Sequence, residues 1–332
     1  VIDPRRTETA KDADVHLQLR PGTDAFLMAA MLGIIVQEGL HDRAFLAQHT
    51  GGFEAVERVL RAVPVADYVA RADVPLADVQ RVARGFAQAS SACVRVDLGI
   101  QQSPRTTLNG YLEKLLFLVT GNFGKRGGNN LHTFLLPVIG HTDERSPKYW
   151  RTASQGMHAI SGIYPPNILP AEIEHTGKDR VRALFVDSAN PAVTAADSQA
   201  YARAFAKLDL LVVVDVAFTE TARLAHYVLP AASQFEKWEC TGFNLEFPVN
   251  AFQLRKPLFA PLGETLPEPE IYTRLLEAMG ELPKRFPVLE RIARTEPQQT
   301  HHMGFLAALG ATLTARPKLQ PYAASLLYRT LG

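Results

Sequence analysis

The chain has 332 residues, of which 47% are hydrophobic and 21% charged, a composition typical of globular proteins with about two domains. Its 35 basic and 34 acidic residues leave a formal net charge of +1, so the overall charge favours no nucleic acid or anionic membrane partner. The longest apolar run, 25–36, is shorter than the roughly twenty residues of a membrane span, and we expect a soluble protein.

The two cysteines, Cys93 and Cys240, lie far apart and in no CxxC arrangement. This chain alone therefore cannot assemble a zinc site or an iron–sulfur cluster. Cysteine usage leaves the compartment open, with the cytoplasm favoured over the periplasm. The chain begins on Val1-Ile2-Asp3, a pattern typical of the last residues of a strand, and we expect that the earlier part of this strand is missing.

Strand and helix patterns alternate along the chain, which predicts an α/β fold with mainly parallel sheets. Apolar runs predict strands at 93–98, 181–186 and 210–214, and helical periodicity predicts helices at 76–89, 107–119 and 198–207. A proline-rich stretch at 141–176 predicts a long crossing loop or a domain boundary, and later helical patterns lie at 270–279, 304–314 and 322–331. We expect two related, incomplete Rossmann-like domains at 1–145 and 146–255, followed by an irregular and helical connecting segment at 256–332.

One segment of the sequence occurs twice. DPRRTETAKDADVHLQLRP begins at Asp3, and DVAFTETARLAHYVLP begins at Asp215. In each copy an Asp ends an apolar strand, and a TETA helix start follows with its first threonine four residues on, Thr7 or Thr219. Ligands of open parallel sheets bind beyond the carboxyl ends of the strands. The repeat therefore indicates two similar nucleotide sites related by approximate symmetry.

Polar residues after these strands are candidates for ligand contacts. Asp3 can accept hydrogen bonds from ribose hydroxyls or a guanine N–H edge, and Arg5 and Arg6 can clamp phosphate. An ordinary turn is the alternative explanation for these three residues. Further on, Gly22 breaks the preceding strand, and Thr23 and Asp24 stand at a helix start that favours anions or simply requires capping.

Two later motifs have the same double interpretation. TGNFGKRGGN supplies Gly124, Gly127 and Gly128, which allow close backbone approach to a bulky cofactor or form a glycine-rich surface turn. Asn190-Pro191 follows a predicted strand and either presents amide groups to a ligand or starts a turn. In the second copy of the repeat, Thr221 is a candidate for a ligand contact together with Thr219. The histidines at 141, 226, 301 and 302 have no recognisable metal-ligand spacing, so we treat them as structural.

Taken in order, these segments resemble the molybdopterin oxidoreductase family, which includes formate dehydrogenases, nitrate reductases and dimethyl sulfoxide reductase. The resemblance runs from Val1 to about Phe259 through VIDPRRTETA, ADVHLQLRPGTDA, VTGNFGKRGG, RALFVDSANPAV and LDLLVVVDVAFTETARLAHYVLPAASQFEKWECTG. In that family two molybdopterin guanine dinucleotides surround one molybdenum or tungsten and are held by two related α/β domains. Its iron–sulfur cysteines and its metal-ligating residue precede the segment that matches Val1. The resemblance thus implies no catalytic residue and no metal ligand in this chain, which we expect to be inactive alone.

The resemblance also implies which residues hold the cofactor. Asp3, Arg5, Thr7, Thr23 and Asp24 would contact one dinucleotide, Asn190, Pro191, Asp215, Thr219 and Thr221 the other, and the glycine-rich loop would approach the pterin. Two positions depart from the family pattern, His226 where an Asp is usual and Cys240 where Gly is common. An intact enzyme would carry out a two-electron reaction on a small substrate and exchange electrons with a partner protein or subunit. The alternatives are a structural or electron-relay subunit like the large subunit of complex I, a non-redox nucleotide-binding module, and a metal-dependent hydratase.

Overall fold

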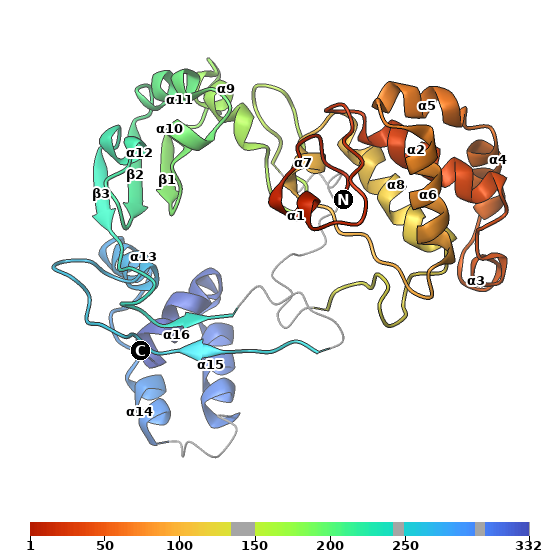
Figure 1. The fold of residues 1–332 in the computed structure, drawn as a ribbon. Coiled ribbons are helices and arrows are strands. Elements are labelled where there is room, and N and C mark those ends of the chain that lie inside the picture. Colours follow the sequence, from red (N-terminus) through yellow and green to blue (C-terminus); the bar gives the residue numbers. More distant parts are fainter. Residues whose placement is uncertain (134–149, 242–248, 296–302, 332) are drawn as a thin grey trace. The chain divides into compact units, whose positions relative to one another are not determined.

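The computed structural model describes residues 1–133, 150–241, 249–295 and 303–331, which form two compact units (Figure 1). The first unit contains residues 1–133 with 249 and 250, and the second contains 150–241 and the described residues from 251 onward. The predicted domain boundary at 145 and 146 lies outside the described residues, as do the histidines at 141, 301 and 302 and part of the predicted 141–176 loop. The boundary at 255 stays a prediction.

A buried helix organises the first unit. In α2 (Asp24–Gln37) ten of the fourteen residues are buried, because its nearly continuous apolar sequence leaves no polar face for solvent. Helices of the same unit pack around α2, namely α4 (Phe53–Arg61), α5 (Val65–Ala72), α6 (Leu76–Gln88) and α8 (Thr106–Val119). The predicted helices at 76–89 and 107–119 are confirmed. The remaining helices of this unit are α1 (Glu8–Lys11), α3 (Arg43–His49) and α7 (Leu98–Gln101).

The predicted strand at 93–98 is wrong. The backbone N–H of Val94 donates to the side-chain oxygen of Asn129 (2.8 Å), and the Val94 carbonyl accepts from the same amide (2.9 Å). Because the side chain of Asn129 occupies the groups that a neighbouring strand would use, the run pairs with no strand among the residues that the structure describes. The helix α7 then begins at Leu98, inside the predicted strand.

The second unit contains a three-stranded parallel sheet. Its order is β1 (Ala183–Asp187), β2 (Leu210–Asp215), β3 (Tyr227–Pro230), and the three strands run side by side in Figure 1. Two helices, α9 (Leu169–Glu174) and α11 (Ser198–Phe205), pack on each other, and the α11 side chains Tyr201 and Phe205 share a buried cluster with Leu211 and Val213 of β2. The strands predicted at 181–186 and 210–214 and the helix predicted at 198–207 are confirmed within a few residues.

Helices dominate the rest of the second unit. They are α13 (Glu268–Ala278), α14 (Pro287–Thr295), α15 (Met303–Ala315) and α16 (Ala323–Leu331). The strands β4 (Glu239–Cys240) and β5 (Leu254–Arg255) form a short antiparallel pair. The short elements are the helices α10 (Pro191–Thr194) and α12 (Glu220–Arg223) and the 3-10 helices η1 (Pro166–Ile168) and η2 (Pro317–Tyr322). The predicted α/β class, with a parallel sheet and a helical C-terminal part, is confirmed. Among the described residues, every helix is too short or too polar to cross a lipid bilayer.

Candidate functional site

The repeated TETA segments have the same local structure in both units. Thr7 precedes α1 with φ −72° and ψ 174°, and Thr219 precedes α12 with φ −70° and ψ 172°. Each hydroxyl accepts a hydrogen bond of 3.2 Å from the backbone N–H three residues later, that of Ala10 or Ala222. Both threonines are therefore N-caps, which satisfies an N–H group that the first helical turn leaves without a partner.

The aspartates before these caps form matching turns. The carboxylate of Asp3 accepts from the backbone N–H of Arg5 (2.7 Å), and that of Asp215 accepts from the N–H of Ala217 (3.0 Å). The strand pairing is also equivalent in the two copies. Ile2 forms a parallel bridge with Leu17, and Val214 pairs in parallel with Leu229. Each residue of the second pair follows its counterpart in the first by the same number of positions that separates Asp3 from Asp215. The sequence repeat is thus a structural repeat of strand, Asp turn, capped helix and strand.

In the second unit, Asn190 is bonded to the repeated helix. Its side-chain oxygen accepts hydrogen bonds from the Thr221 backbone N–H (3.1 Å) and hydroxyl (2.8 Å), and its amide nitrogen donates to Glu220 (2.7 Å). The Thr221 hydroxyl also accepts from the Ala192 N–H (3.1 Å), and Thr221 is fully buried. The structure therefore brings together Asn190, Pro191 at the start of α10, Thr219 and Thr221. Asp215 ends β2, four residues before Thr219.

Glu220 and Tyr272 are two residues of this region that the sequence analysis missed. The hydrogen bond from Asn190 holds the pKa of Glu220 below its usual value, so this exposed side chain stays a charged acceptor that orients the amide. From α13, the Tyr272 hydroxyl donates to Asp187 at the end of β1 (2.7 Å), and burial together with this carboxylate raises the pKa of Tyr272. The TETA motif contained a signal for Glu220, whereas nothing in the local sequence links Tyr272 to a strand 85 residues away.

The two copies differ in charge. Arg5 and Arg6 are exposed, and neither guanidinium forms an ion pair with the described residues. Ala217 and Phe218 occupy the equivalent positions of the second copy, and the Phe218 side chain is 65% exposed. The first copy can therefore offer guanidinium groups to an anion, and the second can offer an aromatic face to a planar ring.

The start of α2 shows a different capping arrangement from the one that its sequence suggests. Thr23 occupies the cap position, but its hydroxyl donates to the Arg20 carbonyl (2.6 Å) and caps no N–H group. Asp24 is the first residue of α2, where its carboxylate complements the helix dipole. Gly22 has φ +78°, which favours glycine, and an added Cβ would approach Pro104 to 3.3 Å.

The glycine-rich loop is held by internal contacts. Asn122 is fully buried, its side-chain oxygen accepts from the Ala92 N–H (3.0 Å), and its backbone bonds to Asn129 (2.8 Å). A Cβ at Gly128 would lie 2.3 Å from the Asn122 carbonyl oxygen, and one at Gly127 would lie 2.6 Å from the Ser91 hydroxyl. At Gly124, with φ +77°, no heavy atom lies within 4 Å of that position. Loop packing therefore explains Gly127 and Gly128, while Gly124 faces open space.

The two departures from the family pattern have structural consequences of different size. The ring of His226 accepts a hydrogen bond from the Leu211 N–H (2.9 Å), and its backbone N–H donates to the Leu211 carbonyl, which anchors the start of β3 on β2. Cys240 lies in β4 and is exposed. Within the described ranges, no group of three or more His, Cys, Asp or Glu side chains is arranged to hold a metal ion.

Comparison with known proteins places this arrangement in a family. The family model for molybdopterin oxidoreductase matches residues 1–278. The chain belongs to the molybdopterin oxidoreductase family. The resemblance inferred from the sequence motifs is thereby confirmed.

The relatives are longer than this chain. The F420-dependent formate dehydrogenase 2 subunit alpha of Methanococcus maripaludis is 33% identical over 298 residues, which cover 84% of this chain and 42% of the relative. The assimilatory nitrate reductase catalytic subunit of Bacillus subtilis is 29% identical over 302 residues, which cover 84% and 41%. Acetylene hydratase from Pelobacter acetylenicus has a similar fold, with a TM-score of 0.70, 23% sequence identity, and coverage of 84% of this chain and 42% of that chain. The molybdopterin oxidoreductase chain thus spans less than half the length of these proteins.

Proposed function

We propose that this chain supplies the dinucleotide-binding parts of a molybdenum or tungsten oxidoreductase that carries two molybdopterin guanine dinucleotides. The observation that carries the proposal is the repeated turn, in which Asp3 with Thr7 and Asp215 with Thr219 have matching hydrogen bonds in two separate units. Two copies of one ligand-binding turn suit two copies of one ligand. Family membership supports molybdopterin as the ligand class.

The residues of each turn fit an anionic dinucleotide. The exposed guanidinium groups of Arg5 and Arg6 suit phosphate oxygens, and a partly exposed carboxylate such as Asp3 suits ribose hydroxyls or the N–H edge of guanine. In the second unit, Asp215 offers the same carboxylate, while Asn190 is fixed by Glu220 and Thr221 so that the loop entering α10 keeps one conformation. Gly124, with open space around its missing Cβ, is the position of the glycine-rich loop that allows the closest approach to a bulky pterin.

When bound, the cofactor supplies a two-electron oxidation or reduction at its metal. The described residues would bind and orient it: Arg5 and Arg6 would neutralise phosphate charge, and Asp3 and Asp215 would fix the nucleoside ends. The names of the relatives support a small substrate such as formate or nitrate and an electron-transfer partner subunit. The proposed domains are 1–145 and 146–255, with 256–332 as the connecting segment.

Nucleotide retention in variants of the intact protein tests this proposal. Acid hydrolysis of the purified protein releases GMP from each bound dinucleotide, so the GMP content per protein counts them. The double variant Arg5→Ala/Arg6→Ala and the single variant Asn190→Ala should each lose up to half of the GMP, because each affects one of two sites. Arg58→Ala in α4 and Gln199→Ala in α11 are matched controls at exposed positions and should retain all of it. GMP content that is the same in all four variants would contradict the proposed assignment.

A further inference from the structure

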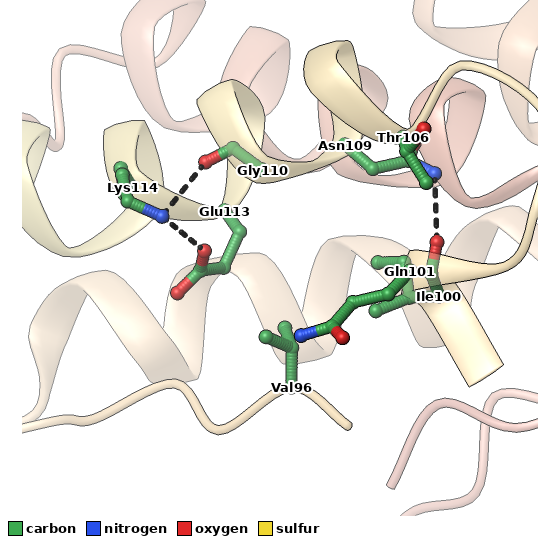
Figure 2. Close-up of a pocket in the computed structure, with 8 residues that line it drawn as sticks. All are labelled: Val96, Ile100, Gln101, Thr106, Asn109, Gly110, Glu113 and Lys114. Atoms are coloured by element: carbon green, nitrogen blue, oxygen red, sulfur yellow. Dashed lines mark hydrogen bonds and ion pairs between the residues drawn. The ribbon is translucent and has the colours of Figure 1, made fainter. Parts of the chain in front are cut away.

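A pocket of about 300 Å³ in the first unit is lined by residues of α7, of α8 and of the segment before α7 (Figure 2). The Asn109 amide is directed toward Ile100, whose carbonyl oxygen accepts at 3.5 Å. The Glu113 carboxylate is directed toward Lys114 and pairs with it at 3.1 Å. These groups therefore do not converge on one ligand. In the second unit, by contrast, two side chains converge on one carboxylate at the end of β1.

That carboxylate belongs to Asp187, and each of its oxygens has a partner. One oxygen accepts a hydrogen bond from the Ser188 hydroxyl (2.8 Å), and the other accepts from the Tyr272 hydroxyl of α13 (2.7 Å). Burial, together with this carboxylate, raises the pKa of Tyr272, so the hydroxyl stays protonated and continues to donate. The two hydroxyl groups therefore hold the Asp187 carboxylate in one orientation.

The helix α13 lies at the carboxyl ends of the strands, which is where ligands of open parallel sheets bind. Ile271, the neighbour of Tyr272, shares a buried cluster with Val214 of β2 and with Ala231. Leu266, which precedes the helix, forms a parallel bridge with Ala231, and Figure 1 shows α13 beside the arrowheads of β2 and β3. Although α13 belongs to the predicted connecting segment, these contacts put it at the same edge of the sheet as the proposed second site.

Asp187 differs from the aspartates of the two repeated turns. Asp3 and Asp215 each accept a hydrogen bond from the backbone N–H two residues later, at 2.7 and 3.0 Å. The equivalent N–H after Asp187 is that of Ala189, which is exposed and donates to no residue that the structure describes. Such turns mimic backbone turns, and types II and I′ have a left-handed residue at the position of Ser188, whose φ is +53°. The closed turn is therefore accessible to Asp187, and its two hydroxyl partners keep it open.

We propose that Tyr272 is a positioning residue that keeps the Ala189 N–H available to the dinucleotide of the second unit. This role rests on the proposed function. An exposed backbone N–H at a strand end suits an oxygen of an anionic ligand. Without the Tyr272 hydroxyl, one oxygen of Asp187 loses its partner, and the carboxylate can turn to accept from Ala189, as the aspartates of the repeated turns accept from their own loops. The ligand then loses a donor and meets a negative charge in its place.

The GMP content of variants of the intact protein tests this role. Tyr272→Phe removes only the hydroxyl, and the content should fall from about two GMP per protein to about one, because only the second site is affected. Asp187→Ala has no carboxylate that could close the turn and should retain both nucleotides, and so should the double variant Tyr272→Phe/Asp187→Ala. Tyr328→Phe in α16 is the matched control, because it removes a half-buried hydroxyl that bonds to no described residue, and it should lose no GMP.

Recovery of GMP in the double variant separates this role from a purely structural one. If the Tyr272 hydroxyl only stabilised the fold, the double variant would lose at least as much GMP as Tyr272→Phe. That result, or a full GMP content in Tyr272→Phe, would overturn the proposal and leave the proposed function standing. Unmodified protein without GMP would instead contradict the proposed function, and this role with it.

Hydrogen exchange of the intact protein, prepared without the cofactor, gives a readout that involves no nucleotide. The Ala189 amide should exchange at least about tenfold more slowly in Tyr272→Phe than in the unmodified protein, because the closed turn protects it. In the double variant the exchange should be as fast as in the unmodified protein. Equal exchange rates in Tyr272→Phe and the unmodified protein would also overturn the proposal.

Discussion

The side-chain oxygen of Asn190 accepts hydrogen bonds from both the backbone N–H and the hydroxyl of Thr221, at 3.1 and 2.8 Å. These contacts join the loop after β1 to the helix after β2, although the two residues lie 31 positions apart. Since Thr221 is fully buried, its hydroxyl has no solvent partner that could replace Asn190. The relationship connects two strand ends of the proposed second site.

Replacing the Thr221 hydroxyl should destabilise this connection. Thr221→Val keeps the side-chain shape but leaves the Ala192 N–H and one acceptor site of Asn190 without a partner, which should cost about 1–3 kcal/mol in the free energy of unfolding. Thr221→Ser retains the hydroxyl and loses only a methyl group, worth about 0.8 kcal/mol. Urea unfolding should place the midpoint of the Val variant below that of the Ser variant. A urea midpoint that is lower for the Ser variant than for the Val variant would show that the hydroxyl does not stabilise this connection.

The two N-caps should contribute equally to stability. Thr7→Ala and Thr219→Ala each remove a hydroxyl that accepts from a backbone N–H at 3.2 Å, and we expect each to lower the free energy of unfolding by about 1 kcal/mol. Thr9→Ala is a control in the same helix, because Thr9 is exposed and is not the cap. Thermal unfolding of the three variants compares these contributions. A Thr9→Ala effect as large as the cap effects would contradict the capping assignment.

The glycines of the TGNFGKRGGN loop should differ in their tolerance of alanine. At Gly128 the new Cβ would lie 2.3 Å from the Asn122 carbonyl oxygen, so backbone must shift, and we expect a loss of about 3 kcal/mol. At Gly124 no neighbour obstructs the Cβ, and only the left-handed conformation at φ +77° costs about 1–2 kcal/mol. Gly124→Asn should recover part of that loss, because Asn adopts this conformation more readily. Chemical denaturation measures the free energy of unfolding of all three variants. Equal losses for the alanine variants at Gly124 and Gly128 would exclude the steric explanation.

Acid should weaken the contacts of Glu172. Burial alone would raise the pKa of this carboxyl, but hydrogen bonds from Ser154 and the Ala153 N–H (2.7 Å) hold it below its usual value. Because the folded-state pKa lies below the unfolded value of about 4.3, the stabilisation is present above that pH and is lost as pH falls through the folded-state pKa. The midpoint temperature of thermal unfolding, measured from pH 7 downward, should therefore fall more steeply below about pH 4.3 for the unmodified protein than for the Glu172→Gln variant. Parallel curves would show that Glu172 contributes no pH dependence.

Sequence patterns predicted the elements whose stability is local. The helix at 76–89, the strands around 181–186 and 210–214, and the TETA repeat could all be inferred, because each depends on periodicity or on a cap a few residues away. The 93–98 run failed because the side chain of Asn129, 35 residues later, bonds the backbone of Val94. Tyr272 was missed for the same reason, since its contact with Asp187 depends on the packing of α13. Pairings across long sequence separations have no local pattern that reveals them.

The most direct test of the proposed function is the ratio of guanine nucleotide to metal in the intact protein, purified from its own host. Mass spectrometry gives the molybdenum and tungsten content, and acid hydrolysis gives the released GMP. We predict about two GMP per metal ion, one for each copy of the Asp and Thr turn. Protein with neither metal nor GMP, from a host that makes the cofactor, would contradict the proposal and favour a structural or electron-relay subunit. GMP without a transition metal would favour a non-redox nucleotide-binding module.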